Sequence, residues 1–165
     1  WNTGYKRKGN FRVGLTTTDG AENSKQSLEL RFNLKESAHK ILAKAENRKK
    51  RDLYFYSGIE FYVKSTQLLT GKIWMVTSNP DNPNIMDAWI GNFDTDTQWK
   101  KVRIPFDSLT IGRGWIKKGA KKYGAKCGDQ ILRLDRIEIL SIGLTNWDNP
   151  PVKGRMWIDK IRFYQ

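Results

Sequence analysis

Alternating apolar and polar residues recur along the chain and predict short β-strands. A period of two is what a strand with one buried and one exposed face produces. Eight segments show this alternation or a short apolar run: residues 11–15, 28–34, 59–64, 73–76, 88–93, 102–106, 137–144 and 156–163. Residues 137–144 are apolar at most positions, which indicates an interior strand covered on both faces.

The segment 37–51 is compatible with either a helix or a strand. Its Ala, Lys and Glu residues favour a helix, but its apolar residues make only a poor stripe at helical spacing. We therefore expect a strand over residues 40–46. The polar turn 35–37 would then join it to the strand 28–34 as a hairpin.

Many short strands with regular turns argue for an antiparallel β-sandwich formed by residues 1–165 as one domain. No internal repeat or low-complexity linker divides the chain. The long loops over residues 78–84, 107–129 and 146–153 are where binding side chains usually lie. Because the chain begins Trp-Asn-Thr-Gly, without Met or signal peptide, we expect a piece excised from a larger multidomain protein.

The net charge of +13 indicates that a negatively charged partner is more plausible than a positively charged one. It suggests nucleic acid, anionic membranes or acidic polymers, while a solvated basic surface is the plainer explanation. No apolar run approaches the roughly 18 residues of a membrane span, so no membrane partner is expected. With one Cys and one His, a Cys/His zinc site cannot be assembled from one chain.

Catalytic patterns are weak, and we expect no enzyme. His39 is the one histidine, and no Gly-x-Ser-x-Gly elbow is present. Turn formation and capping explain the carboxylates that flank the strands, which are Asp81, Asp87, Asp94, Asp96 and Asp107. The segment 112–114 (Gly-Arg-Gly) lacks the rest of a nucleotide-binding loop.

The seven Trp residues are the most informative side chains. Trp74 is expected on the polar side of its strand, and Trp89 shares one side of its strand with Asp87. Trp115 and Trp147 lie in polar loops that contain Gly or Pro. Rings exposed beside Asp, Asn and Arg suit sugar recognition, because the C–H face of a pyranose stacks on an aromatic ring while its hydroxyls form hydrogen bonds. The plainer explanation is that some of these rings plug the ends of the sandwich.

Other aromatic residues have different interpretations. Trp99, at a strand start, and Trp157, inside a late apolar strand, are most simply core residues. The lysines near Trp115 and Tyr123 satisfy a loose rule for single-stranded nucleic acid, in which basic groups alternate with stacking rings. Because the basic residues elsewhere are scattered along the chain, we do not expect nucleic acid as the partner.

Three segments resemble a known family. Residues 94–109 read DTDTQWKKVRIPFDSL and fit a Trp-Lys-x-Val/Ile-x-Ile-Pro-Phe pattern, and residues 58–64 and 157–161 (WIDKI) fit as well. Together they resemble the family 11 carbohydrate-binding modules and the related complex I intermediate-associated assembly-factor domains. Both groups share a galactose-binding-domain-like jelly roll, so the resemblance implies an all-β sandwich of that type whose usual first strand is missing here.

The resemblance also implies a function. It implies a non-catalytic, monomeric, secreted module, attached to a glycoside hydrolase in an extracellular protein, that binds plant polysaccharide chains such as β-1,4-glucan or mannan. The family places Arg, Asp and Tyr in the loop after Ile-Pro-Phe; this chain has Arg113, Trp115 and Tyr123 there, and no Asp until Asp129. Where the family has a groove Tyr, this chain has Leu144. The expected sugar-binding residues are Trp74, Asp87, Trp89, Arg113, Trp115, Tyr123, Asn146 and Trp147.

No cofactor is required, although a structural calcium is usual in this fold group. Asp159 matches the acidic ligand of the last strand, while the acidic N-terminal strand that helps to hold the ion is missing. Two other functions stay open: a protein-interaction domain of the assembly-factor type, and a module that binds polyanions or nucleic acid.

Overall fold

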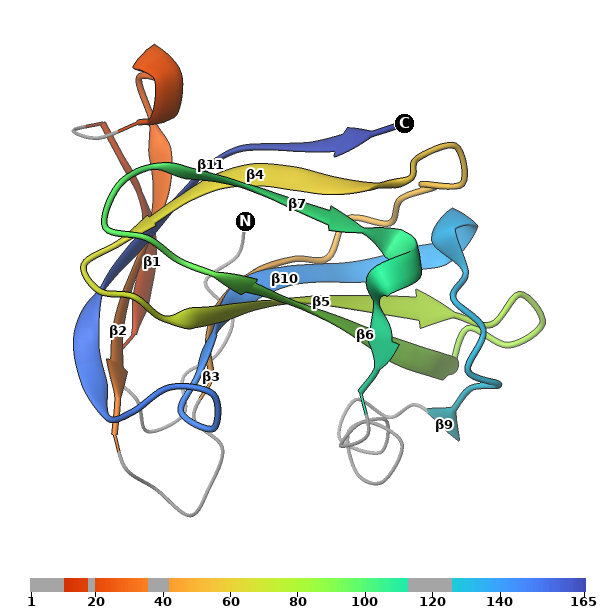
Figure 1. Cartoon of the computed structure of the whole chain (residues 1–165). Coiled ribbons are helices and arrows are strands. Elements are labelled where there is room, and N and C mark those ends of the chain that lie inside the picture. The colour runs from red at the N-terminus through yellow and green to blue at the C-terminus, as the bar shows by residue number, and fades with distance from the viewer. Residues whose placement is uncertain (1–10, 18–19, 36–41, 113–125) are drawn as a thin grey trace.

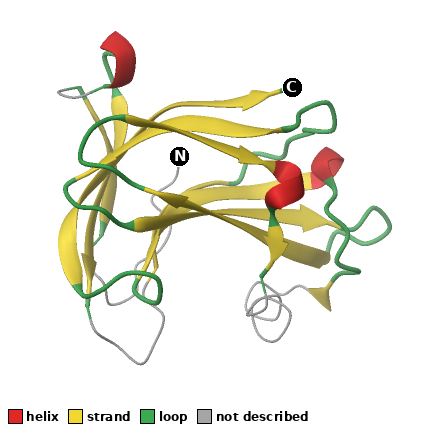
Figure 2. Ribbon diagram, in the orientation of Figure 1, coloured by secondary structure: helices red, strands yellow, loops and turns green. Residues whose placement is uncertain are grey.

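The computed structural model describes residues 11–17, 20–35, 42–112 and 126–165, and in it the chain forms an all-β sandwich of two facing sheets, as predicted (Figures 1 and 2). The five-stranded sheet has the order β1 (Arg12–Thr16), β2 (Ser27–Leu34), β11 (Val152–Tyr164), β4 (Gly58–Ser65) and β7 (Lys100–Pro105). The six-stranded sheet has the order β3 (Leu42–Asn47), β10 (Ile137–Thr145), β5 (Thr70–Ser78), β6 (Ile85–Asp94) and β8 (Thr110–Ile111), with β9 (Lys126–Cys127) parallel to β6. Short 3₁₀ turns lie at Ala21–Asn23, Phe106–Ser108 and Leu134–Arg136.

The hydrophobic core lies between the two sheets. Alternate residues of each strand point into it, so the apolar half of each alternating pattern is buried. The fully buried large side chains come from both layers: Leu30, Phe32, Leu34, Ile59, Phe61 and Met156 from one sheet, and Ile73, Met75, Ile137, Leu140, Ile142 and Leu144 from the other. The other half of each strand faces outward, which gives the sandwich two outer faces for possible partners.

The segment 37–51 contains a strand, as expected, but the predicted hairpin is wrong. β3 pairs with β10 in the six-stranded sheet, and β2 lies between β1 and β11 in the other sheet. Ala43 and Ala45 point into the core, where β3 and β2 face each other across the two layers. A period of two identifies a strand and its buried side, but it does not identify the neighbouring strand.

Two further expectations have different outcomes. β10 is an interior strand between β3 and β5, as its apolar composition indicated. Trp157 is not a core residue: its neighbours Met156 and Ile158 are buried, whereas Trp157 is half-buried on the outer face of the five-stranded sheet. Its indole N–H donates to Glu29 Oε2 at 3.2 Å. Trp99, just before β7, is half-buried.

Among the described residues, no helix combines the length and the apolar character needed to cross a membrane.

Candidate functional site

The outer face of the six-stranded sheet has Trp74 at its middle. The register places Glu46, Ser141, Trp74 and Ile90 opposite one another, in a row across β3, β10, β5 and β6. Because Ile73 and Met75 are buried in the core, Trp74 points outward, as its sequence neighbours predicted. Its side chain is half-buried, so part of it reaches solvent. We call this surface the Trp74 face.

A charged cluster lies beside Trp74 in the same row. Lys44 and Glu46 form an ion pair although both are buried, and Lys44 Nζ lies 3.3 Å from Ser141 Oγ. Arg48 Nε donates to the other carboxylate oxygen of Glu46 at 2.6 Å. Burial raises the pKa of Glu46, but the hydrogen bonds and charges of Lys44 and Arg48 outweigh it and leave the pKa below its ordinary value. Glu46 is therefore ionised at neutral pH, and its two carboxylate oxygens already accept from Lys44 and Arg48.

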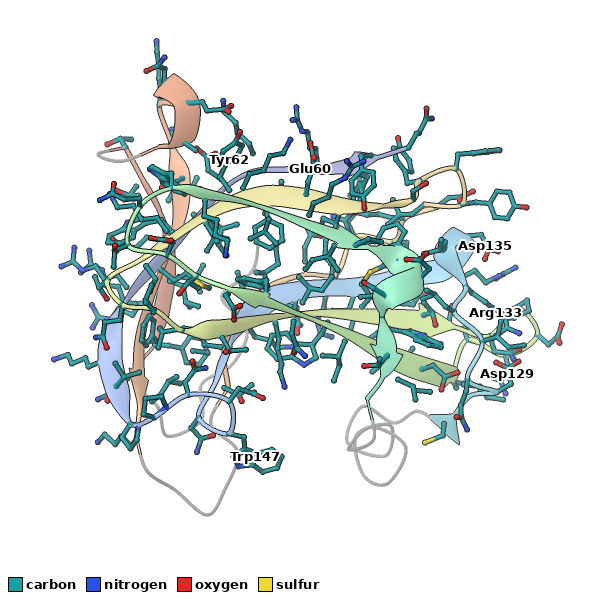
Figure 3. All side chains as sticks on the ribbon, in the orientation of Figure 1. Glu60, Tyr62, Asp129, Arg133, Asp135 and Trp147 are labelled. Atoms are coloured by element: carbon teal, nitrogen blue, oxygen red, sulfur yellow. The ribbon has the colours of Figure 1, made fainter. Side chains whose placement is uncertain are left out.

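A second row on the same face connects the sheet to an exposed ring. Lys72, two residues before Trp74 on β5, points outward and its Nζ lies 2.7 Å from Asp148 Oδ1. Asp148 directly follows Trp147, whose side chain is 65% exposed. Figure 3 shows Trp147 beyond the six-stranded sheet, pointing away from the sandwich. The Lys72–Asp148 pair thus places the loop that carries Trp147 at one end of the Trp74 face.

Hydrogen bonds hold this loop in a fixed shape. The Trp147 N–H donates to Thr145 Oγ1 at 3.2 Å, and the Thr145 hydroxyl pairs with Asp148. Asn149 donates to the carbonyl oxygens of Thr70 and Thr145, both at 2.9 Å, and accepts from the Thr70 N–H at 2.8 Å. An exposed ring on a fixed loop loses little entropy when it binds a partner. Asn146, also a predicted site residue, is half-buried in the same loop.

Asp87 and Trp89 share a face, as predicted, but it is the inner face of the sheet and not that of Trp74. They pair with Thr77 and Met75, whereas Trp74 lies opposite Ile90. The buried Asp87 carboxylate accepts from the Gly128 N–H at 3.1 Å and from the Gln130 N–H at 2.8 Å. Their neighbours Ala88 and Ile90 point outward although they are apolar. The assumption that the apolar residues of β6 face the core was therefore wrong for this strand.

Asp87 and Asp129 anchor the segment that follows β9. Asp129 forms a bidentate pair with Arg133, with both N–O distances at 2.7 Å. That pairing lowers the pKa of Asp129 to about 2. Trp89 packs against the core and its indole N–H lies 3.3 Å from Thr77 Oγ1. These contacts explain Asp87 and Trp89 as residues that stabilise the fold.

Arg113, Trp115 and Tyr123 lie outside the described residues, and their assignment as sugar-binding residues stays a prediction from sequence. Sequence reasoning missed Lys44, Glu46, Lys72 and Ser141. The alternation Ala-Lys-Ala-Glu in β3 put Lys44 and Glu46 on one face, and that signal could have found them. Their position beside Trp74 depends on the pairing of β3 with β10, which the sequence did not reveal.

The residues near Asp159 do not fit a calcium site. Asp159 Oδ2 accepts the Ala21 N–H at 2.9 Å and its Oδ1 accepts the Lys160 N–H at 2.7 Å. The Lys160 ammonium lies 2.8 Å from Glu22 Oε2 and 3.2 Å from the Glu22 carbonyl oxygen, so it contacts the kind of oxygen atoms that calcium would need. Within the described part of the chain, no three His, Cys, Asp or Glu residues are grouped so that they could hold a metal ion.

A shallow hollow of about 280 Å³ lies elsewhere, between residues 50–52, Ser78 and residues 135–138. Its lining is mostly charged, and Glu138 already pairs with Lys50 at 3.5 Å and accepts from Ser78 at 2.8 Å. Because its lining contains no aromatic ring, the hollow lacks the stacking surface for a sugar that the Trp74 face has.

Comparison with known structures decides the fold type. A family 11 carbohydrate-binding module from Clostridium thermocellum, solved with a β-1,3-1,4-mixed-linked tetrasaccharide, superposes with a TM-score of 0.72 at 14% identity, over 96% of this chain and 85% of that one. A family 30 module of a cellulosomal cellulase from the same organism gives 0.62 at 14% identity, over 93% and 82%. The chain has the fold of the family 11 and family 30 carbohydrate-binding modules.

The same fold also occurs inside larger enzymes. An exo-β-agarase matches 98% of this chain with a TM-score of 0.57 at 13% identity, but only 24% of the agarase is covered. By sequence, no family profile and no curated protein matches the chain. The carbohydrate-binding-module fold is therefore established from structure, and the ligand has to be argued from the chain's own residues.

Proposed function

We propose that the Trp74 face binds a neutral polysaccharide chain of the β-linked glucan or mannan type, without cleaving it. The observation that carries the proposal is the outward, half-buried ring of Trp74 together with the exposed ring of Trp147 on the adjoining loop. The ion pair between Lys72 and Asp148 connects the two positions, and both of its side chains are partly accessible to solvent. Glu46 and Ser141 lie beside Trp74 in the register but are buried, so they hold the strands next to the ring and do not contact the ligand.

The chemistry of the face suits a pyranose chain. Trp74 and Trp147 offer ring surface to the C–H faces of sugars, and the partly accessible Lys72 and Asp148 offer charged hydrogen-bonding groups to hydroxyls. One ring on the sheet and a second on the loop at its end favour an extended chain over a single monosaccharide. Nothing in this arrangement requires a bond to break, and the proposed role is attachment to the polysaccharide.

The comparisons support the same ligand class. One family 11 module was solved with a mixed-linked β-glucan tetrasaccharide, and another belongs to a cellulosomal cellulase. By analogy, we place this domain in a secreted protein beside a glycoside hydrolase, which it would hold against its substrate. In this proposal the domain acts as a monomer, because one face of one chain supplies all the named groups.

Affinity electrophoresis against soluble mixed-linked β-glucan, hydroxyethyl cellulose and glucomannan tests the proposal. We expect at least one of the three to retard the chain. Trp74→Ala and Trp147→Ala should each weaken that binding about tenfold, because each removes one stacking ring. Trp157→Ala is the matched control, because Trp157 is also half-buried and points outward, but from the opposite sheet. The affinity of this variant for the polysaccharide should stay within twofold of that of the native chain.

The outcomes separate function from site. Failure of all three polysaccharides to retard the native chain would contradict the proposed function. Binding that survives both Trp74→Ala and Trp147→Ala would keep the function but contradict the site. Because all three variants change outward side chains, their melting temperatures should show that they fold.

A further inference from the structure

The outer face of the five-stranded sheet carries three arginines directly opposite one another. The register pairs Arg12 of β1 with Arg31 of β2, and Arg31 with Arg155 of β11. We call these three residues the arginine row. All three are exposed, and the Arg31 and Arg155 side chains are 56% and 51% accessible. Like charges placed directly opposite each other destabilise a sheet, so the fold itself does not account for this row.

The carboxylate beside the row compensates it only in part. Glu29 pairs with Arg31 and lies 3.7 Å from Arg155 Nη1, so one negative charge is shared by two guanidinium groups. Glu29 also accepts the Trp157 indole N–H. The exposed Lys153 lies two residues before Arg155 on the same side of β11. Together, these groups leave an excess of positive charge on this part of the face.

The same arrangement repeats farther along the sheet. Glu60 on β4 pairs with Arg162 of β11 and with Lys101 of β7, at 3.1 Å for Lys101. Arg103 is the direct partner of Glu60 across the β4–β7 ladder. Figure 3 shows Glu60 on the side of the sandwich opposite Trp147, so this basic surface is separate from the Trp74 face. Positive charge therefore extends across several strands.

Three rings on the described part of this face each have a cation nearby. Lys64 Nζ lies 5.8 Å from the centre of Trp157, Lys160 Nζ lies 6.0 Å from Tyr62, and the Arg103 guanidinium lies 3.7 Å from Tyr164. Proteins that bind single-stranded nucleic acid without sequence preference stack bases on open aromatic rings. Rings that already carry a cation favour a partner recognised by charge alone.

We propose that the outer face of the five-stranded sheet is a second binding surface, on which the arginine row holds a linear polysaccharide that bears carboxylate or sulfate groups. The planar fork of Arg matches both anions with two parallel hydrogen bonds. Adjacent strands about 4.8 Å apart space the three arginines regularly, as a repeating polyanion requires. The surface uses no residue of the Trp74 face, and the proposal goes beyond the proposed function.

Affinity electrophoresis with polygalacturonate and with dextran sulfate, at 20 mM and 300 mM salt (about 20 Å and about 6 Å of screening length), tests the second surface. We expect at least one polymer to retard the native chain at low salt and to release it at high salt. The double variant Arg31→Gln/Arg155→Gln should bind about tenfold more weakly, since two charge-assisted contacts are lost. Lys25→Gln/Lys49→Gln removes the same charge outside the row and should stay within twofold.

A second variant guards against loss of folding. Arg31→Gln/Arg155→Gln leaves the buried Glu29 with fewer partners, whereas Arg12 forms no ion pair with any other described residue. Arg12→Gln should therefore melt like the native chain and still bind the polyanion a few-fold more weakly. Polygalacturonate and dextran sulfate together distinguish carboxylate from sulfate as the recognised group.

Other outcomes would overturn the proposal. Equal losses in the arginine and lysine double variants would mean that net charge alone attracts the polymer. Retention of a single-stranded oligonucleotide with no retention of either polysaccharide would assign the face to nucleic acid. Binding of neutral β-glucan by the arginine variants serves as an independent readout, because it should be unchanged whether the second surface exists or not.

Discussion

At the scale of single residues, Lys160 supplies a positive charge where the last strand meets the turn at Ala21–Asn23. Its backbone has a φ of 47°, in the left-handed region that costs a non-glycine residue about 1–2 kcal/mol. The side chain offsets that cost by contacting the carboxylate and carbonyl oxygens of Glu22. The hydrogen bond from Lys160, and then that from Tyr62, lowers the pKa of Glu22. The ammonium group of Lys160 therefore connects the last strand to the turn at Ala21–Asn23, which is far from it in the sequence.

This arrangement predicts that stability does not depend on calcium but does depend on Lys160. Adding EDTA or calcium should leave the Tm unchanged, whereas Lys160→Met should lower it by a few degrees because Glu22 loses its cation. Since the folded pKa of Glu22 is depressed, its contribution is present above the ordinary value of 4.5 and is lost as the pH falls through the lower folded pKa. The difference in Tm between the native chain and Lys160→Met should shrink over that range.

Differential scanning calorimetry from pH 7 down to pH 3 measures both effects. Lys25→Met is the control, since Lys25 is an exposed lysine near the same turn. A Tm that falls when EDTA is added would show that a metal ion does bind, and the assignment of Lys160 as the cation would then be wrong.

At the scale of elements, the pairing of β3 with β10 creates the Trp74 face. Gly143 permits it, because a Cβ built there would lie 2.1 Å from the Ala43 carbonyl oxygen and 2.6 Å from the Lys44 Cα. The edge strand β3 brings Lys44 and Glu46 next to Ser141 only through this close approach. The buried ion pair that lies beside Trp74 thus depends on one glycine in a neighbouring strand.

Gly143→Ala should therefore push β3 away from β10. We expect a loss of about 1–3 kcal/mol in the free energy of unfolding, as for other overpacked sites, measured by urea denaturation. Gly14→Ala is the matched control, because Gly14 also lies within a strand but a Cβ there would meet nothing within 4 Å. An equal effect of both substitutions would mean that glycine flexibility, and not the approach of β3, sets the cost.

The sequence predicted the strands well because alternation is a local property. The alternating segment 28–34 and the apolar segment 137–144 became β2 and β10 with nearly the predicted bounds. Pairing is not local, so the partner of β3 was missed and the Glu46–Ser141–Trp74 row could not be assembled. Trp74 was placed correctly because its two neighbours are fully buried. Asp87 was misplaced because a buried acidic residue that caps backbone N–H groups has the same sequence setting as an exposed one.

At the scale of the whole molecule, the two proposed surfaces lie on opposite sides of the sandwich. One face presents rings and paired charges, and the other presents cations in excess of carboxylates. The two outer faces are separated by both sheets, which are about 10 Å apart, and a neutral glucan carries no net charge on which the distant cations could act. Charges on one outer face should therefore have little influence on a neutral ligand bound to the other.

Both ligands should consequently bind at the same time. We expect the affinity for neutral β-glucan, measured by isothermal titration calorimetry, to change less than twofold when dextran sulfate saturates the chain. It should also change less than twofold between 20 mM and 300 mM salt, while the affinity for the polyanion falls steeply. Trp74→Ala should weaken only the first ligand and Arg31→Gln/Arg155→Gln only the second. If dextran sulfate instead displaces the glucan, both polymers share one surface, and the division of the sandwich into two binding faces is wrong.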